Sequence, residues 1–297
     1  MKYRLIKALV MPLAWMPFGV LYALSDLIYL LIYRIAGYRK GVVRDNLARC
    51  FPDKTDRERL DIERQFFRNF ADNIVETIKL LHISDDEMRR RMKFDNDGLI
   101  DKRLSSGRSI VIYFAHTFNW EWAPSVTLHT AVKPDDKHVF AQVYRPLRDA
   151  AFDRLMLDIR SRFGSRSFPK SSTLRDLLRL RRDGAASVTG FMSDQHPSHG
   201  DPGYLTTLLG RPTLMISGTE TLARKLDMTV MYWDISRPSR GHYHITTRLI
   251  TDHPADEPDG SITETYTRLL EKTIRRDPSL WLWSHKRWKH PVTPQQK

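Results

Sequence analysis

Three features of the sequence predict an α/β fold with a central, mostly parallel or mixed sheet flanked by helices, and with an N-terminal membrane-associated helix. Short apolar runs alternate with amphipathic stretches along most of the chain, which is typical of helices layered on a sheet. One run, Ser109 to Phe114, is short, apolar and β-branched, as expected for a buried strand. Residues 1–36 are dominated by apolar side chains, which indicates a segment in contact with a membrane.

Length and composition limit the number of domains. The 297 residues are 41% hydrophobic, which suits one main core with an attachment. We therefore divide the chain into an N-terminal membrane anchor helix, residues 1–36, and a main domain, residues 37–297. The single cysteine, Cys50, excludes an internal disulfide framework.

The positive charge of the chain indicates an anionic partner. The formal net charge is +13 and the pI is about 9.9, so either a phospholipid leaflet or a nucleic acid would be attracted. None of the familiar nucleic-acid-binding motifs occurs in the sequence, and the apolar N-terminus favours a membrane. We therefore expect anionic membrane lipid, and no nucleic acid, among the partners.

The N-terminal segment has the features of a retained membrane anchor. Ala8 to Leu24 carries no charge, and the apolar pattern resumes after Asp26. The segment is too long for a signal-peptide core, and no small-residue cleavage site follows it. Pro12 and Pro17 interrupt it, so a crossing helix and a kinked, half-inserted helix both stay open. Basic residues on both flanks leave the orientation open, and a buried core helix is the remaining alternative.

Beyond the anchor, the apolar pattern predicts the other elements in order. A charged helix with apolar residues at helical spacing follows Pro52 and Asp53. The buried strand at Ser109 to Phe114 comes next, and a helix begins near Trp120. We expect further strands at 139–144, 186–192, 228–235 and 242–250, and further helices at 149–163, 173–182, 220–225 and 261–276.

A histidine and a glutamate follow the predicted buried strand in the segment AHTFNWEW. Five steps along a helix turn by about 500°, so His116 and Glu121 would not share a helical face, and His116 must lie in the turn before the helix. Asn119 is a good N-cap, which places Glu121 in the first helical turn and lets His116 fold back onto it. A carboxylate that accepts one ring N–H would fix the imidazole tautomer, and the other nitrogen could then take a proton from an alcohol. A satisfied surface pair is the alternative.

This segment resembles the H-x4-[D/E] motif of the glycerolipid and lipid A acyltransferase superfamily, and within it the H-x-G-N-W-E version of the lipid A biosynthesis (lauroyl/myristoyl-type) acyltransferases. Four further blocks also look like that family. They are NLARCFPD at 46–53, VYRPLRD at 143–149, SDQ at 193–195 and WLWSHKRWK at 281–289. One residue departs from the pattern, because Phe118 stands where the family has glycine. A turn that needed positive φ there would be strained by about 1 kcal/mol or more.

The resemblance implies an O-acyltransferase and assigns roles to four residues. His116 would be the general base, and Glu121 would orient it and balance its charge. Arg145, in the YRP turn, is our candidate donor to the tetrahedral oxyanion. Asp194 matches a family site position and would position groups around that oxyanion. Residues 37–297 would then form the catalytic domain.

Two residues are candidates for substrate binding. Asn119 would contact the acceptor, with helix capping as its other role. Arg211, in LLGRPT, could meet a phosphate, and an ordinary exposed arginine in a loop is the alternative. We expect the C-terminal block, Trp281 to Lys289, to pack its indoles into the domain and to leave its charges in water. An interfacial clasp near the membrane or the donor is its alternative role.

The resemblance implies secondary acylation in lipopolysaccharide synthesis. A fatty acyl group would move from the thioester of acyl carrier protein to a hydroxyl of a lipid A precursor, without a cofactor, at the cytoplasmic face of a bacterial inner membrane. A sister enzyme that acylates a lysophospholipid, an aminolipid or another glycolipid is the first alternative, and a non-catalytic basic membrane-surface protein is the second. A metal site at His116 and Glu121, or at His196, His199 and Asp201, lacks the spacing of a metalloenzyme helix motif, so we expect no metal.

Overall fold

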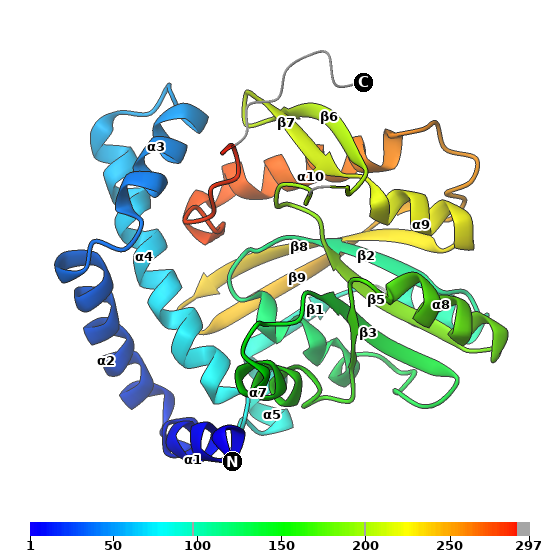
Figure 1. Cartoon of the computed structure of the whole chain (residues 1–297), viewed down its shortest axis with the longest axis horizontal. Helices are drawn as coiled ribbons and strands as arrows, with labels where there is room; N and C mark the ends of the chain where they lie inside the picture. The colour runs from blue at the N-terminus through cyan, green and yellow to red at the C-terminus, as the bar shows by residue number, and fades with distance from the viewer. Residues whose placement is uncertain (97, 199, 290–297) are drawn as a thin grey trace.

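A seven-stranded sheet runs through the centre of the computed structural model, which describes residues 1–96, 98–198 and 200–289 (Figure 1). The strands are β1 (Met92–Asp95), β2 (Ile110–Phe114), β3 (His138–Tyr144), β4 (Arg166–Pro169), β5 (Ala186–Met192), β8 (Thr229–Ser239) and β9 (His242–Thr251). Their order is β1-β9-β8-β2-β5-β3-β4, and all neighbours are parallel except β8 and β9. The predicted mostly parallel or mixed sheet is confirmed.

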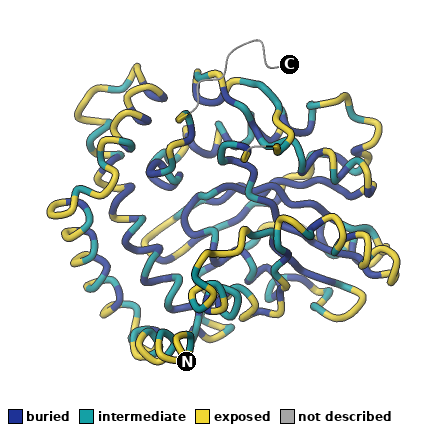
Figure 2. Tube along the Cα trace, in the orientation of Figure 1, coloured by how far each residue is buried: buried dark blue, intermediate teal, exposed yellow. Residues whose placement is uncertain are grey.

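Helices cover both faces of the sheet (Figure 1). They are α5 (Asp85–Arg91), α6 (Leu99–Ser105), the 3-10 helix η2 (Trp120–Leu128), α7 (Ala150–Arg160), α8 (Thr173–Arg182), α9 (Gly218–Leu226), α10 (Ser261–Arg276) and the 3-10 turn η3 (Pro278–Leu280). The fully buried strand β2 contributes to both cores, since Ile112 packs in the cluster that contains α7 and Tyr113 in the cluster that contains α10. This explains why its apolar run has no polar alternation. Figure 2 shows the central strands as buried.

The N-terminal segment lies along a long helix beside the sheet (Figure 1). Its elements are α1 (Lys2–Trp15), α2 (Phe18–Tyr29), the π-helical η1 (Leu30–Ile35), α3 (Lys40–Cys50) and the long helix α4 (Asp56–Lys79). The chain breaks between α1 and α2 at Pro17, whereas Pro12 lies inside α1. Phe18–Ile35 is long and apolar enough to cross a membrane by length and composition, and 22% of it is buried.

Several predicted elements match the structure closely, and others were not expected. The bounds of α8, β5 and α10 agree with the prediction, and the helix near Trp120 is the 3-10 helix η2. The structure adds β1, β4 and a separate antiparallel hairpin of β6 (Gly203–Leu208) and β7 (Arg211–Ile216). Both residues of the hairpin turn, Leu209 and Gly210, have positive φ, as a two-residue turn requires.

Candidate active site

His116 and Asp194 come together because their strands are paired. β2 and β5 are parallel neighbours with Phe114 opposite Met192, so the chain leaves both strands at the same edge of the sheet. His116 Nδ1 lies 2.7 Å from Asp194 Oδ1, and the backbone N–H of His116 donates to Asp194 Oδ2 at 3.1 Å. The indole of Trp281 donates to the same Oδ2 at 2.9 Å. Three donors therefore hold this carboxylate against the imidazole.

Because Asp194 is ionised, it determines which nitrogen of the His116 ring carries a proton. Burial of Asp194 opposes its ionisation, but the charge of His116 and the hydrogen bonds from His116 and Trp281 outweigh it and hold the pKa of Asp194 at about 2. An ionised carboxylate can only accept, so Nδ1 donates its proton to Asp194, and Nε2 is the nitrogen left to act as a base. The amide nitrogen of Gln195 lies 3.3 Å from Nε2.

Glu121 does not hold the His116 ring, which differs from the expectation from sequence. Its carboxylate is 8% exposed and forms two hydrogen bonds with the guanidinium of Arg160 on α7, at 2.9 and 2.6 Å. A bidentate arginine is a strong partner for a carboxylate, and Asp194 already occupies Nδ1 of His116. Trp120 connects the two residues, because its indole donates to Glu121 at 3.2 Å and its ring lies edge-on to that of His116.

Asn119 caps η2, as the sequence predicts. Its side-chain oxygen accepts a hydrogen bond from the backbone N–H of Glu121 at 3.1 Å. Its amide group donates to Glu76 of α4 at 3.0 Å, and the side chain is fully buried. Contact between Asn119 and a substrate stays a prediction.

Phe118 fits the turn without the strain that we considered. It does not have positive φ, and the peptide bond to Asn119 is cis. The ring is fully buried and stacks between Phe66 and Trp120, with centroid distances of 5.9 and 5.3 Å. The aromatic side chain therefore forms part of the core beneath the turn.

Replacement of Phe118 by alanine should lower the free energy of unfolding by about 3–5 kcal/mol, because it leaves a cavity among aromatic rings. Chemical denaturation followed by circular dichroism measures this change. Phe152→Ala on α7 is the matched control, since that ring is 50% exposed and should cost little. Equal effects of the two substitutions would contradict the assignment of Phe118 to the core.

The structure places the two predicted arginines differently. Arg145 follows β3, a parallel neighbour of β5, so it leaves the same edge of the sheet as His116. It is exposed, and nothing in the described part of the chain hydrogen-bonds to it. Arg211 begins β7, and its guanidinium stacks on the ring of Trp288 at 4.2 Å from the centroid. The alternative of an exposed loop arginine is therefore wrong, and the role of each arginine stays a prediction.

The C-terminal block packs into the domain, but one of its charges is not in water. Trp281 and Trp283 are buried, as expected, whereas Arg287 is only 1% exposed, which corrects the prediction. The guanidinium of Arg287 donates to the backbone carbonyl of Leu214 at 2.6 Å, and burial lowers the pKa of Arg287 to about 10.

Within the described ranges, no group of three or more His, Cys, Asp or Glu side chains could hold a metal ion. His199, a member of the alternative metal cluster, lies outside the described residues.

Fold and site together define a class of protein. An imidazole that is oriented by a buried carboxylate, at the carboxyl edge of a mostly parallel sheet, can deprotonate a hydroxyl for group transfer. The family model of the bacterial lipid A biosynthesis acyltransferases matches residues 2–290, so the chain belongs to that family and is an O-acyltransferase.

Two relatives agree with this assignment. The chain is 22% identical, over 278 residues, to the lipid A biosynthesis palmitoleoyltransferase of Escherichia coli (strain K12). This match covers 92% of this chain and 86% of the relative. The lipid A biosynthesis acyltransferase of Shigella flexneri matches with the same identity and coverage.

Proposed function

We propose that this chain transfers a fatty acyl group from the thioester of acyl carrier protein to a hydroxyl of a lipid A precursor, at the cytoplasmic face of the bacterial inner membrane. The observation that carries the proposal is the His116–Asp194 pair in a member of the lipid A acyltransferase family. The E. coli relative is a palmitoleoyltransferase, which supports a fatty acyl group as the transferred group. Residues 37–297 would be the catalytic domain and residues 1–36 the membrane anchor.

In this reaction His116 is the general base. Nε2 takes the proton of the acceptor hydroxyl as the hydroxyl oxygen attacks the thioester carbonyl carbon, and Asp194 stabilises the imidazolium that forms. Collapse of the tetrahedral intermediate breaks the carbon–sulfur bond. The leaving thiolate takes the proton back from His116, so the products are an ester and a free thiol, and the base is restored.

Three further side chains have proposed roles around this step. Arg145, exposed at the same edge of the sheet, would donate to the oxyanion. Glu121 would balance charge from its pair with Arg160 and not by a direct hydrogen bond to the imidazole. Arg211 would contact a phosphate of the acceptor.

The N-terminal segment would lie in the membrane interface and would not cross the bilayer. Its outward side carries exposed leucines, Leu27 and Leu31 among them, and the same side is exposed in Figure 2. Its inward side bonds to charged residues of α4, with Ser25 donating to Asp72 at 2.7 Å. A crossing helix would take such carboxylates into hydrocarbon, which is costly. Half-insertion, with the leucines among the lipid chains, avoids this cost.

Binding to vesicles that contain anionic lipid should weaken with added salt, because a chain with a net charge of +13 is attracted to the lipid headgroups. The double substitution Leu27→Asp and Leu31→Asp should lower binding about 100-fold by removing two inserted side chains. Flotation of the protein with vesicles measures both effects. Leu249→Asp, at a 43% exposed leucine of β9, is the control and should bind normally. Equal binding to neutral vesicles would contradict the electrostatic part.

The acceptor and the donor are tested by one transfer assay. The native chain is given acyl carrier protein or coenzyme A thioesters, together with a lipid A precursor, a lysophospholipid or an aminolipid. The proposal predicts rapid acylation of the precursor from acyl carrier protein. Transfer only to the lysophospholipid or the aminolipid would support the sister-enzyme alternative, and transfer only from coenzyme A would change the donor.

A further inference from the structure

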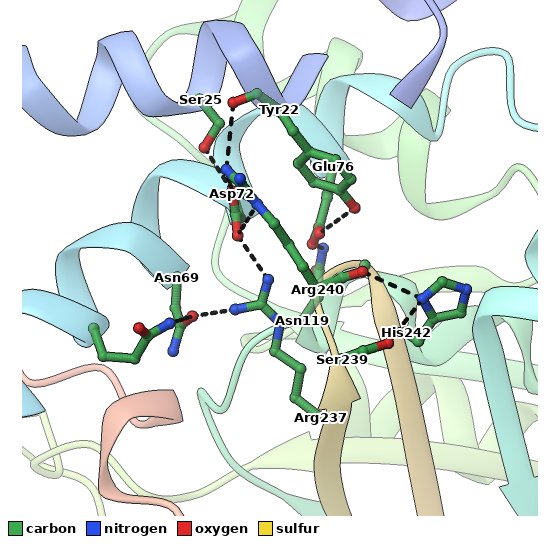
Figure 3. A network of polar contacts seen from close by, with 12 residues as sticks. Tyr22, Ser25, Asn69, Asp72, Glu76, Asn119, Arg237, Ser239, Arg240 and His242 are labelled. Carbon is green, nitrogen blue, oxygen red and sulfur yellow. Dashed lines mark hydrogen bonds and ion pairs between the residues drawn. The ribbon is translucent and has the colours of Figure 1, made fainter. Parts of the chain in front are cut away.

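Glu76 is a buried carboxylate on the face of α4 that meets the turn between His116 and Glu121. Its side chain is fully buried, and the hydroxyl of Tyr243 donates to its Oε2 at 2.8 Å. The hydroxyl of Tyr22, from α2, lies 3.1 Å from its Oε1 (Figure 3). Burial raises the pKa of Glu76. A carboxyl group in such a place is costly unless its partners are fixed, so its contacts are informative.

Two further contacts of Glu76 reach the turn after His116 and the first residues of η2. Oε2 of Glu76 accepts the amide N–H of Asn119 at 3.0 Å, and the backbone carbonyl of Glu76 accepts the indole N–H of Trp122 at 3.2 Å. The other end of the Asn119 amide caps the backbone N–H of Glu121. Glu76 therefore fixes which way the Asn119 amide faces, because a rotated amide would turn its NH2 group towards the Glu121 donor.

The same face of α4 continues this network one turn earlier. Asp72 is 2% exposed and accepts hydrogen bonds from Arg237 and Arg240 of the β8–β9 hairpin and from Ser25 of α2 (Figure 3). These contacts fix α4 relative to the sheet. Glu76 is thus held on a rigid helix, as a residue that positions a catalytic group must be.

We propose that Glu76 is a positioning residue for acyl transfer, which sets the geometry of the turn between His116 and Glu121 through its hydrogen bond to Asn119. The inference rests on the proposed function. Glu76 does not touch the reacting atoms, and its effect passes through the backbone of the turn. Shifts of about 1 Å in such supporting structure can cost about 100-fold in rate.

Glu76→Met keeps the apolar stem and removes both acceptor oxygens. We expect kcat for acyl transfer to fall about 10–100-fold, with KM for the donor changed less than about 3-fold. Hydrogen exchange of the backbone amides in residues 117–122, followed by mass spectrometry, should quicken about 10-fold, because the Asn119 amide is no longer held in the orientation that caps Glu121. Glu76→Gln should keep both kcat and the exchange rate near the native values. Its amide oxygen can accept from Asn119 and Tyr243, while its NH2 group faces the Tyr22 oxygen.

Glu63→Met is the matched control on the same helix. Glu63 is 2% exposed and binds Tyr33 and Arg44, with no hydrogen bond to the turn. Glu63→Met should lower the free energy of unfolding, but it should neither quicken exchange in residues 117–122 nor lower kcat per folded molecule. Unchanged exchange in Glu76→Met, or equal losses in Glu63→Met, would overturn the proposal. If exchange quickens as expected while the native chain acylates no lipid, Glu76 still sets the geometry of the turn, and it is the proposed function that fails.

Discussion

Replacement of His116 by alanine should lower kcat for acyl transfer by about 10²–10⁴-fold, the range that general-base catalysis contributes. The loss follows because no other described side chain pairs with Asp194 in a way that would leave a basic nitrogen at this edge of the sheet. The free energy of unfolding should also fall, because the buried Asp194 loses one of its hydrogen-bond donors, so kcat is compared per folded molecule. Steady-state transfer to a lipid A precursor measures the loss, and thermal unfolding checks the fold.

A second histidine provides the control for this experiment. His138 begins β3, at the opposite end of the parallel strands, where it contacts Asp135 in a partly exposed position. His138→Ala should leave kcat unchanged, because it removes an imidazole that also pairs with an aspartate but lies far from the proposed chemistry. Full activity in His116→Ala would remove His116 from the mechanism. Equal losses in both variants would point to a general effect on folding.

The sequence could predict the fold class, because the strands are short apolar runs with clear ends. β5 and α10 agree with their predicted bounds. The hairpin of β6 and β7 was missed because a leucine, Leu209, occupies a turn position with positive φ where glycine or asparagine is usual. β1 and β4 were missed because each is only four residues long, so their pattern is too short to separate from a loop.

The sequence located the histidine, but it could not determine which carboxylate holds the ring. That depends on strand order, and β5 pairs with β2 although η2, β3, α7, β4 and α8 lie between them in the chain. Glu121 is close to His116 in sequence, but it pairs with Arg160 instead. The helix that carries Arg160 lies beside η2 only in the folded chain. Proximity in sequence therefore favoured the wrong partner for the imidazole.

Glu76 was also missed, although the sequence contains a signal for it. Asn69, Asp72, Glu76 and Lys79 recur at helical spacing in α4, and all four are buried. A polar stripe of this kind, beside the aromatic stripe of the same helix, is not expected of a face that only covers a core. Contacts with the N-terminal segment explain part of this polar stripe, since the ammonium group of Lys79 donates to the backbone carbonyls of Ala14 and Met16 at the end of α1.

Substitution of Asp194, the carboxylate beside His116, should also cause a large loss of kcat. Asp194→Asn should lower kcat by about 10²–10⁴-fold, although the two side chains have the same shape. The backbone N–H of His116 and the indole of Trp281 both donate to Oδ2, so the amide oxygen should take that place. The amide NH2 group then faces Nδ1, which must accept, and the ring proton moves to Nε2. Nε2, which faces the place where the hydroxyl would bind, is then protonated and cannot accept the hydroxyl proton.

Asp252→Asn is the control for this substitution, because the pKa of Asp252 is also about 2. Hydrogen bonds from Arg103 and Thr229 and the nearby charges of Arg103 and Arg108 lower this pKa, against the effect of burial. Asp252 lies after β9, where it bonds to Thr229 at the start of β8, at the edge of the sheet opposite to His116. Both folded pKa values lie below the usual 3.8, so each carboxylate is charged at neutral pH and loses its contribution to stability only as the pH falls towards 2. At neutral pH, Asp252→Asn should therefore cost stability but leave kcat intact, whereas Asp194→Asn should abolish most of kcat. A variant Asp194→Asn with native kcat would show that the tautomer of His116 is set by another group.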